Sequence, residues 1–294
     1  MKLASTLRIA GIALCVTLLA LSACHRATLL LPDHPQQSPG VTLQDVTFHS
    51  SALGRDMPYR VLLPADLPAG QKLPVVYLLH GGGGNFRDWS NNSNVAQYAL
   101  KGLILVMPEG ESSYYVNAVE APRDRFEDYI ASDLIADVEA RLPARKGRES
   151  RAIAGVSMGG FAAIQYALTR PELFAFAAAI SPATDVPSRR FSFKHIDQWW
   201  RFRRIFGPIG SPGRQALDPF VQVQSANPQA APYIYMTSGQ QEPLLGPNRR
   251  FAAQLKQRSF AFEFHTRPGG HDWGEWDAQL PGCFSSLLKH LPKI

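Results

Sequence analysis

The feature that most constrains the fold of this 294-residue chain is the hexapeptide Gly-Val-Ser-Met-Gly-Gly at positions 155–160. It follows an apolar run at 151–155 and opens a small-residue-rich apolar stretch at 159–169, as a strand and a helix joined by a tight turn would. Such a turn leaves no room for flanking side chains, and the glycines at 155 and 159 meet this demand. The pattern G-x-S-x-G also arises by chance, but this context favours a nucleophile elbow with Ser157 exposed at its tip.

Apolar runs typical of buried strands recur along the rest of the chain, and helical patterns lie between them. We expect strands at 41–48, 59–63, 74–79, 102–107, 151–155, 174–180, 233–237 and 260–265. We expect helices at 126–141, 159–169, 248–257 and 283–291. Strands that alternate with helices predict an α/β fold, with a mostly parallel sheet covered by helices on both faces. The stretch 184–229 fits neither period, and we expect an irregular excursion over the carboxyl edge of the sheet.

A serine hydroxyl needs a base that takes its proton, and in folds with this elbow the acid and then the histidine follow the serine along the chain. His80 and His195 come before any suitable acid, and His265 lies within an expected strand of alternating pattern. His271 lies beyond the last expected strand, in a glycine-containing loop that can carry an imidazole over the sheet edge. His271 is therefore the predicted base.

The acid is expected after the strand at 233–237, and Glu242 is the first carboxylate that follows it. Asp272 adjoins the base in sequence, where its side chain would point away from the Nδ1 atom of the imidazole. A glutamate after a strand is also an ordinary surface residue. Chain order nevertheless predicts that Glu242 orients His271 and stabilises its protonated form.

The negative oxygen formed by attack on a carbonyl needs two backbone N–H donors. We predict the amide of Met158, directly after the serine, as one donor. The other is expected in the glycine-rich loop at 80–85, where glycines let the backbone approach a substrate closely; we predict Gly82, with Gly81 as the alternative. A glycine run can also hold phosphate, but no Lys-Ser/Thr pair follows it, which excludes a P-loop. No His or Cys spacing indicates a metal site, and no cofactor is expected.

The first residues have the features of an export signal. Lys2 and Arg8 give a basic start, and an apolar run follows at 9–20. This run is shorter than the roughly 20 residues of a typical membrane-spanning helix. It ends in Leu-Ser-Ala-Cys at 21–24, which resembles the lipobox of bacterial lipoproteins, where a peptidase cuts before the cysteine and its thiol is acylated. An ordinary signal peptide with a chance cysteine is the alternative.

These patterns predict a lipoprotein signal peptide at 1–23, a polar, Pro-rich tether at 24–40 and one domain at 41–294. They predict export and a membrane anchor through lipid on Cys24, in the periplasm, at the outer membrane or at the cell surface. Without Lys2 and Arg8, 28 basic residues remain against 24 acidic ones, a net charge of +4. That small excess, without a basic stripe, does not indicate nucleic-acid binding. Cys283 would have no partner, so we expect no disulfide.

At this point the residues resemble the esterase D family, which includes S-formylglutathione hydrolases, feruloyl and acetyl-xylan esterases, tributyrin esterases and mycolyltransferases. The resemblance runs from about residue 41 to the C-terminus. It rests on Val-Tyr-Leu-Leu-His-Gly at 76–81, Pro-Glu-Gly at 108–110, Glu-Asp-Tyr-Ile at 127–130, the elbow at 155–160, Gly-Gln-Gln-Glu at 239–242 and Gly-His-Asp-Trp at 270–273. It implies the α/β-hydrolase fold and a serine hydrolase of carboxylic esters. The acid is Glu rather than the commoner Asp, and the family supplies no motif for the stretch that contains Trp199 and Trp200.

We therefore expect an exported hydrolase that cleaves carboxylic esters through a Ser-His-Glu triad and an acyl-enzyme. Acyl transfer to an alcohol or sugar uses the same triad and is the alternative; a non-catalytic binding module has no need of all three residues. The expected partner is a small-molecule or glycan-linked ester, and export disfavours the cytosolic S-formylglutathione reaction. Trp199, Trp200 and Trp273 are the candidate pocket residues. The stretch 184–229 is expected to form a partial lid, with packing of its rings on the domain as an equal alternative.

Overall fold

The computed structural model describes residues 32–189 and 196–292. The chain divides into two compact units, Met1–His34 and Pro35–Ile294, and every element named below belongs to the second unit. Cys24, the predicted lipidation site, lies outside the described residues. Among the described residues, no helix has both the length and the apolar character needed to cross a membrane.

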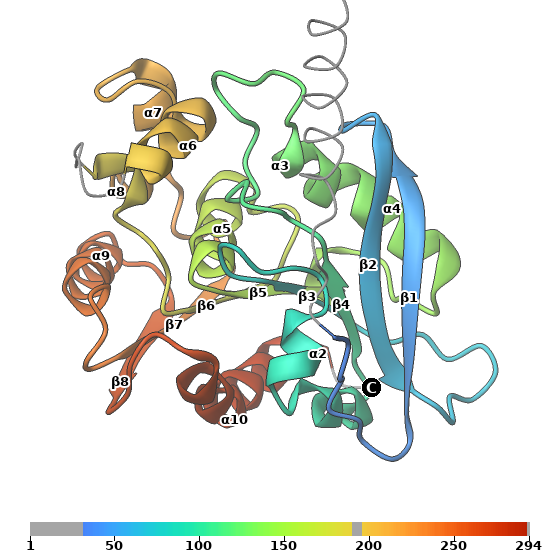
Figure 1. Cartoon of the computed structure of the whole chain (residues 1–294). Coiled ribbons are helices and arrows are strands. Elements are labelled where there is room, and N and C mark those ends of the chain that lie inside the picture. The colour runs from blue at the N-terminus through green and yellow to red at the C-terminus, as the bar shows by residue number, and fades with distance from the viewer. Residues whose placement is uncertain (1–31, 190–195, 293–294) are drawn as a thin grey trace, which may run out of the picture. The chain divides into compact units, whose positions relative to one another are not determined.

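One eight-stranded sheet forms the centre of the second unit (Figure 1). Its strands lie in the order β1-β2-β4-β3-β5-β6-β7-β8. β1 and β2 pair antiparallel with their neighbours, whereas β3 to β8 pair in parallel. The mostly parallel sheet expected from the sequence is confirmed. The strands are β1 (Val41–Ser50), β2 (Arg55–Pro64), β3 (Val75–Leu79), β4 (Ile104–Pro108), β5 (Arg151–Val156), β6 (Phe176–Ile180), β7 (Tyr233–Gly239) and β8 (Phe262–Arg267).

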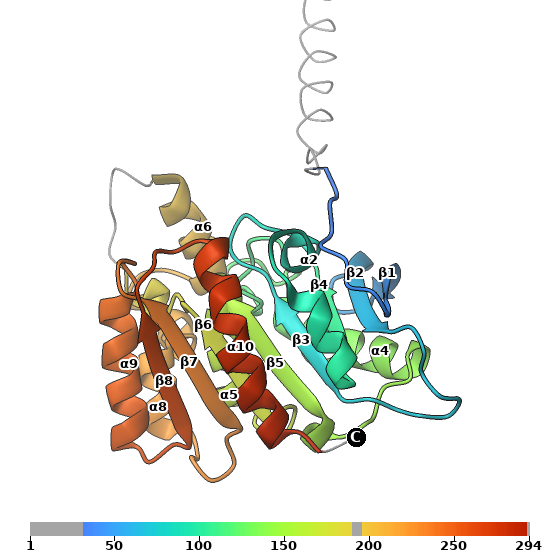
Figure 2. The same ribbon diagram turned by 90° about the horizontal axis from the view of Figure 1, so that it is seen from below.

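Helices cover both faces of the sheet. In its central strands, the residues that point to one face and those that point to the other are both apolar. Tyr77 and Leu79 pack into one hydrophobic cluster, and Val76 and Leu78 pack into another on the opposite face. Complete burial of one such side chain stabilises a fold by roughly 1.5–3 kcal/mol. The first cluster is covered by α3 (Phe126–Asp128), the π-helix η2 (Tyr129–Leu134), α4 (Ile135–Arg141), α5 (Met158–Thr169), α8 (Pro219–Ser225) and α9 (Leu245–Gln257). The second is covered by η1 (Val95–Lys101) and α10 (Trp273–His290), and Figure 2 shows α10 along this face.

The stretch 184–229 is more regular than expected. It holds the 3-10 turn η4 (Val186–Ser188) and the helices α6 (Ile196–Phe206), α7 (Pro212–Ala216) and α8. α7 and α8 each begin with proline, and the side chains of Ser211 and Asp218 cap them by accepting backbone N–H groups. Short capped helices of this kind have no apolar period long enough to read in a sequence.

The last helix begins earlier than expected. α10 begins at Trp273 rather than at Cys283, and the Asp272 side chain caps it by accepting the N–H of Glu275 at 3.1 Å. Pro281 lies inside the helix. An internal proline is uncommon because it lacks an N–H and usually ends or kinks a helix, so the first turns of α10 are hard to predict from the sequence.

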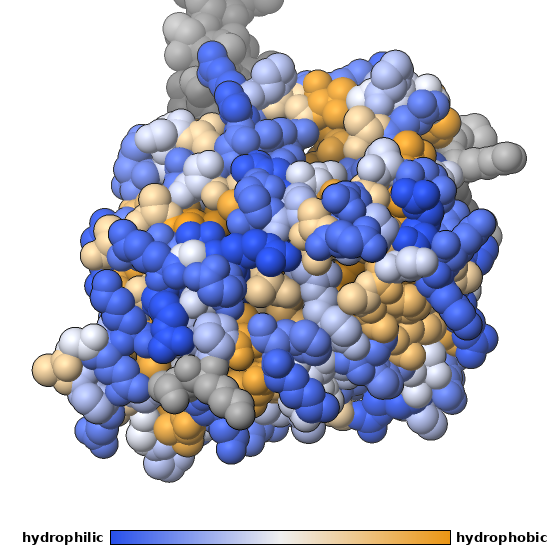
Figure 3. Space-filling model, turned by 180° about the vertical axis from the view of Figure 1, so that it is seen from behind, coloured by the Kyte–Doolittle hydropathy of each residue, from blue (hydrophilic) through white to orange (hydrophobic). Residues whose placement is uncertain are grey.

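The surface of the described residues is mixed. On the face shown in Figure 3, hydrophilic side chains cover most of the area and hydrophobic ones lie among them. The large hydrophobic side chains that are exposed come from separate elements; they are Leu100, Val119, Trp200, Ile209, Val221 and Leu288.

Candidate active site

Ser157 lies at a strained turn between β5 and α5. Its backbone has φ 54° and ψ −108°, a conformation that side-chain-bearing residues rarely adopt and that marks functional turns. A Cβ atom on Gly155 would overlap the backbone of Gly159, and one on Gly159 would overlap the carbonyl of Leu79 on the neighbouring strand. The two glycines therefore have the steric role that the sequence predicted for an elbow.

The three predicted triad residues lie in one hydrogen-bonded chain. The Nε2 atom of His271 is 2.9 Å from the Oγ atom of Ser157, and its Nδ1 atom is 2.8 Å from the Oε2 atom of Glu242. The Glu242 side chain is fully buried, whereas that of His271 is 28% exposed. An ionised carboxylate can only accept a hydrogen bond, so Glu242 keeps the imidazole proton on Nδ1. Nε2 is then free to accept the serine hydroxyl proton.

The loops that carry the acid and the base are paired with each other. The N–H of Gln240 donates to the Arg267 carbonyl at 2.8 Å, and the N–H of Gln241 donates to the Gly269 carbonyl at 2.9 Å. The Gln241 side-chain oxygen accepts the N–H of Gly269 in return. These bonds extend the parallel β7–β8 pairing into the two loops, so the positions of Glu242 and His271 are set together.

The two residues predicted as oxyanion donors lie next to each other. Met158 is the first residue of α5, whose first N–H groups have no partner within the helix. A Cβ on Gly82 would lie 4.0 Å from the Met158 Cβ, and one on Gly81 would lie 3.6 Å from the Ser157 Cβ. The glycine loop folds back on itself, since the Gly84 N–H donates to the Gly81 carbonyl at 3.1 Å. The structure thus places Gly82 beside Met158, in the wall of the cavity that Ser157 also lines.

Two residues that sequence reasoning did not assign hold this loop in place. His80 is buried. Its Nδ1 atom lies 2.8 Å from the Gly81 carbonyl oxygen, and its Nε2 atom accepts the Gly110 N–H at 2.9 Å. Glu109 accepts backbone N–H groups from Phe86, Gly110 and Glu111. Burial raises the pKa of Glu109, but the neighbouring His80 and the backbone N–H groups that it accepts outweigh burial, so its pKa lies below the ordinary value. The signal in the sequence that could have found these two residues is that each is a polar residue directly after one of two neighbouring buried strands.

A cavity of about 260 Å³ opens over the serine. It is lined by Gly81, Gly82, Gly84, Asp88, Ser157, His271, Asp272, Trp273 and Trp276. Trp273 makes edge contacts with Trp89 and Trp276, at ring separations of 5.3 and 5.1 Å, and the Trp276 ring meets the His271 ring at 5.0 Å. One wall is therefore aromatic and rigid. Burial raises the pKa of Asp88.

The other two tryptophans predicted for the pocket do not line this cavity. Trp200 on α6 is 60% exposed, and its ring contacts Trp199 edge-on at 4.6 Å. Further along the same helix, Phe202 and Phe206 pack on the Tyr114 ring at 5.8 and 5.2 Å. For these two phenylalanines the packing alternative is correct. The assignment of Trp199 and Trp200 to a substrate pocket stays a prediction, since an aromatic-rich segment does not reveal in which direction each ring points.

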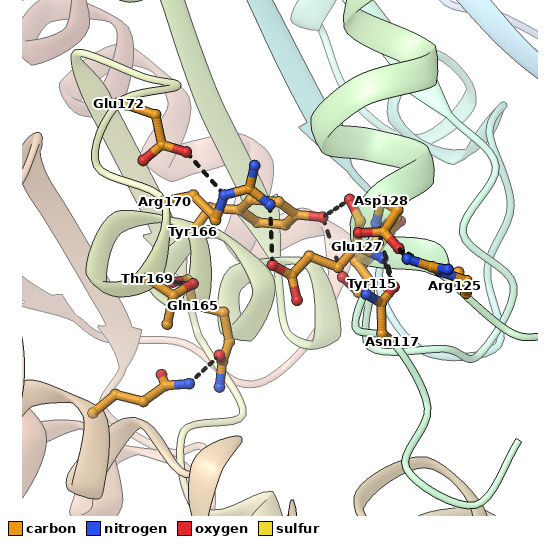
Figure 4. Close-up of polar contacts among 11 residues, drawn as sticks. Tyr115, Asn117, Arg125, Glu127, Asp128, Gln165, Tyr166, Thr169, Arg170 and Glu172 are labelled. Carbon is orange, nitrogen blue, oxygen red and sulfur yellow. Dashed lines mark hydrogen bonds and ion pairs between the residues drawn. The ribbon is translucent and has the colours of Figure 1, made fainter. Parts of the chain in front are cut away.

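The helix behind the elbow is tied to the loop that follows β4 (Figure 4). The Tyr166 hydroxyl lies 3.2 and 3.3 Å from the carbonyl oxygens of Tyr115 and Glu127, and the Arg170 guanidinium pairs with the Glu127 carboxylate at 3.4 Å. Asn117 completes this group, since its side-chain oxygen accepts the N–H groups that open α3. These contacts fix α5, and with it the Met158 amide, against the neighbouring loop.

Among the described residues, no group of three His, Cys, Asp or Glu side chains could hold a metal ion.

The proteins similar to this chain are esterases and serine hydrolases, in agreement with the hydrogen-bonded Ser-His-Glu chain. An acetyl esterase of Caldicellulosiruptor saccharolyticus is 25% identical over 270 residues, which are 85% of this chain and 99% of that protein. An esterase of Mycobacterium tuberculosis is 31% identical over 252 residues, 76% of this chain, and the match spans 54% of that longer protein. The fluorophosphonate-binding serine hydrolase F of Staphylococcus aureus has a similar fold, with a TM-score of 0.73, 24% identity, and coverage of 83% of this chain and 97% of that one.

The family described as "Putative esterase" matches residues 50–287, which is most of the chain and includes every residue of the hydrogen-bonded Ser-His-Glu chain. The fold predicted from the sequence, an α/β-hydrolase, and the resemblance to this family are both confirmed. The chain belongs to the esterase family and is a serine hydrolase of the carboxylesterase type.

Proposed function

We propose that the protein hydrolyses carboxylic esters of small acyl groups, acetyl above all, through an acyl-enzyme on Ser157. The observation that carries this proposal is the continuous hydrogen-bonded chain from Ser157 through His271 to the buried Glu242. His271 takes the hydroxyl proton while the Ser157 Oγ atom attacks the acyl carbon. The oxygen that becomes negative is held by the amides of Gly82 and Met158. The C–O bond then breaks, and the alcohol leaves with the proton from His271.

The second half of the reaction repeats these steps with water as the nucleophile. His271 takes a proton from water, hydroxide adds to the acyl carbon, and the acid leaves as Ser157 regains its proton. The partial exposure of His271, 28% of its side chain, supports entry of water rather than its exclusion. That favours hydrolysis over acyl transfer to another alcohol. Transfer would be recognised by an acylated acceptor among the products in place of free acid.

The size of the cavity supports a small acyl group. Its 260 Å³ lies below the usual range for drug-sized ligands, roughly 300–1,000 Å³, and the rings of Trp273 and Trp276 form part of its wall. The acetyl esterase among the similar proteins agrees with this assignment.

The acyl-length preference tests the assignment. In a series of p-nitrophenyl esters from acetate to octanoate, we expect kcat/KM to fall as the acyl chain lengthens. Trp273→Ala should shift the preference toward longer chains by about tenfold in relative kcat/KM, since room for one more methylene in an apolar pocket is worth roughly 1–3 kcal/mol of discrimination. Trp200→Ala is the matched control, because its ring lies outside the cavity. A wild type that prefers octanoate, or an equal shift in both variants, would contradict the assignment.

We also propose that the protein is exported and anchored by lipid on Cys24. The basic start, the apolar run at 9–20 and the Leu-Ser-Ala-Cys sequence at 21–24 support this. Mass spectrometry of the mature protein from a membrane fraction should find Cys24 at the N-terminus carrying acyl chains. Cys24→Ala should release the protein from membranes without changing esterase activity. A mature N-terminus at any other residue refutes the anchor.

A further inference from the structure

The wall of the active-site cavity carries two carboxylates that the triad does not use. Asp88 is the first residue of α2 (Asp88–Asn92), and Asp272 directly follows His271. Both line the cavity with Ser157. No Lys or Arg is among the described residues that line it. Apart from the histidine, the charged groups on the cavity wall are therefore negative.

Neighbouring cations do not neutralise these two groups. Arg87, next to Asp88 in sequence, pairs with Asp45 at 3.6 Å, and Arg267, near the base loop, pairs with Glu275 at 3.6 Å. Among the described residues, neither Asp88 nor Asp272 has a Lys or Arg nitrogen within ion-pair distance.

Asp88 is the better placed of the two. It is half-buried, and its Oδ2 atom lies so close to Gly84 that a Cβ there would overlap it. The Asp88 N–H donates to the Asn85 carbonyl at 3.1 Å, which fixes this residue at the end of the glycine loop. Asp272 is more exposed, and its Oδ1 atom is engaged in capping α10. A charge in a half-buried position is screened less by solvent and salt than an exposed one.

We propose that Asp88, assisted by Asp272, makes this site select neutral, hydroxyl-rich or cationic esters and reject esters that carry a carboxylate near the reacting carbonyl. Like charges a few ångströms apart in a partly desolvated site repel, whereas a carboxylate accepts hydrogen bonds from hydroxyl groups. Partially acetylated sugars present such hydroxyls beside the ester, and they carry no negative charge. The inference rests on the proposed function, because the two carboxylates act only on an ester bound beside Ser157.

A matched pair of acetates tests the charge effect alone. Methyl 4-acetoxybenzoate and 4-acetoxybenzoate have the same acetyl group and ring, but only the second carries a carboxylate. We measure the ratio of kcat/KM for the anionic ester to that for the neutral ester in each variant. Differences in intrinsic reactivity cancel when this ratio is divided by that of the wild type. Asp88→Asn should raise the ratio on the order of five- to tenfold, and Asp272→Asn should raise it less.

Two controls separate the cavity from the net charge of the protein. Asp66→Asn changes the net charge by the same amount at an exposed position outside the cavity and should leave the ratio as in the wild type. In the wild type itself, raising the salt from about 0.1 M to 1 M shortens the screening length from about 10 to 3 Å and should raise the ratio, though by less than Asp88→Asn does, because a half-buried charge is screened only in part. This second measurement needs no variant to fold.

The outcomes distinguish failure of the inference from failure of the proposed function. If the neutral acetate is hydrolysed but neither Asp88→Asn nor salt changes the ratio, the inference is wrong and the esterase assignment stands. An equal rise in Asp66→Asn also overturns it, since net charge would then be the cause. If the wild type cleaves neither ester faster than Ser157→Ala does, the proposed function itself fails.

Discussion

Replacing Ser157 by alanine is expected to lower kcat for p-nitrophenyl acetate by about 10⁶-fold, which would leave only a trace of the wild-type rate. The variant removes the Oγ atom that lies 2.9 Å from the His271 Nε2 atom. Without it, no covalent acyl-enzyme forms. The loss is measured as the rate of ester hydrolysis by the purified protein, compared with the uncatalysed rate in the same buffer.

The fold should survive this substitution, because alanine differs from serine only by the hydroxyl. Ser188→Ala removes a hydroxyl from an exposed serine outside the cavity and is the matched control, with expected activity equal to wild type. Thermal unfolding followed by circular dichroism should give both variants Tm values near that of the wild type. A Ser157→Ala protein that is folded and still hydrolyses the ester at an undiminished rate would place the chemistry elsewhere.

Glu242→Gln is expected to lower kcat by roughly 10²- to 10⁴-fold while changing KM little. The Glu242 side chain is fully buried and lies 2.8 Å from Nδ1 of His271. A glutamine of the same shape can donate an N–H to Nδ1, which favours the tautomer with its proton on Nε2. That tautomer cannot accept the serine proton, and no negative charge remains to stabilise the imidazolium.

Asp272→Asn is the matched comparison, since it makes the same chemical change one residue from the base. Asp272 caps α10 through the N–H of Glu275, and asparagine caps a helix almost as well. We therefore expect kcat for a neutral acetate to fall by less than about tenfold. The comparison is made by steady-state kinetics on the same ester. A larger loss in Asp272→Asn than in Glu242→Gln would show that Asp272, not Glu242, is the acid.

The sequence predicted the strands well, and the three residues that it singled out for a triad lie in one hydrogen-bonded chain, because both choices depend on local signals. Buried parallel strands are short apolar runs, and the elbow at Ser157 forces glycine at fixed positions. The order serine, acid, histidine then limited each choice to the loop after a particular strand. Glu242 and His271 could be selected in this way without knowledge of any contact between them.

What the sequence did not predict depends on direction and on long-range contacts. The pattern of aromatic residues on α6 does not show that Phe206 packs on Tyr114 while Trp200 faces outward. The bond between His80 and the Gly110 N–H joins two loops that are neighbours only because β3 pairs with β4. Asp88 likewise reaches the cavity from a helix too short to show a period.

The pairing of the acid loop with the base loop has a consequence for how this protein can vary. Glu242 and His271 are held to each other by bonds that continue the β7–β8 register, and α9, which connects the two strands, takes no part in them. Substitutions on the exposed face of α9, or in the turn that follows it, would leave the loops of Glu242 and His271 in the same alignment, as long as β8 kept its partner. The exposed residues of this connection are thus a place where surface chemistry can drift, or be engineered, at little cost to the reaction, whereas Asn248, Phe251 and Leu255 are buried in the fold.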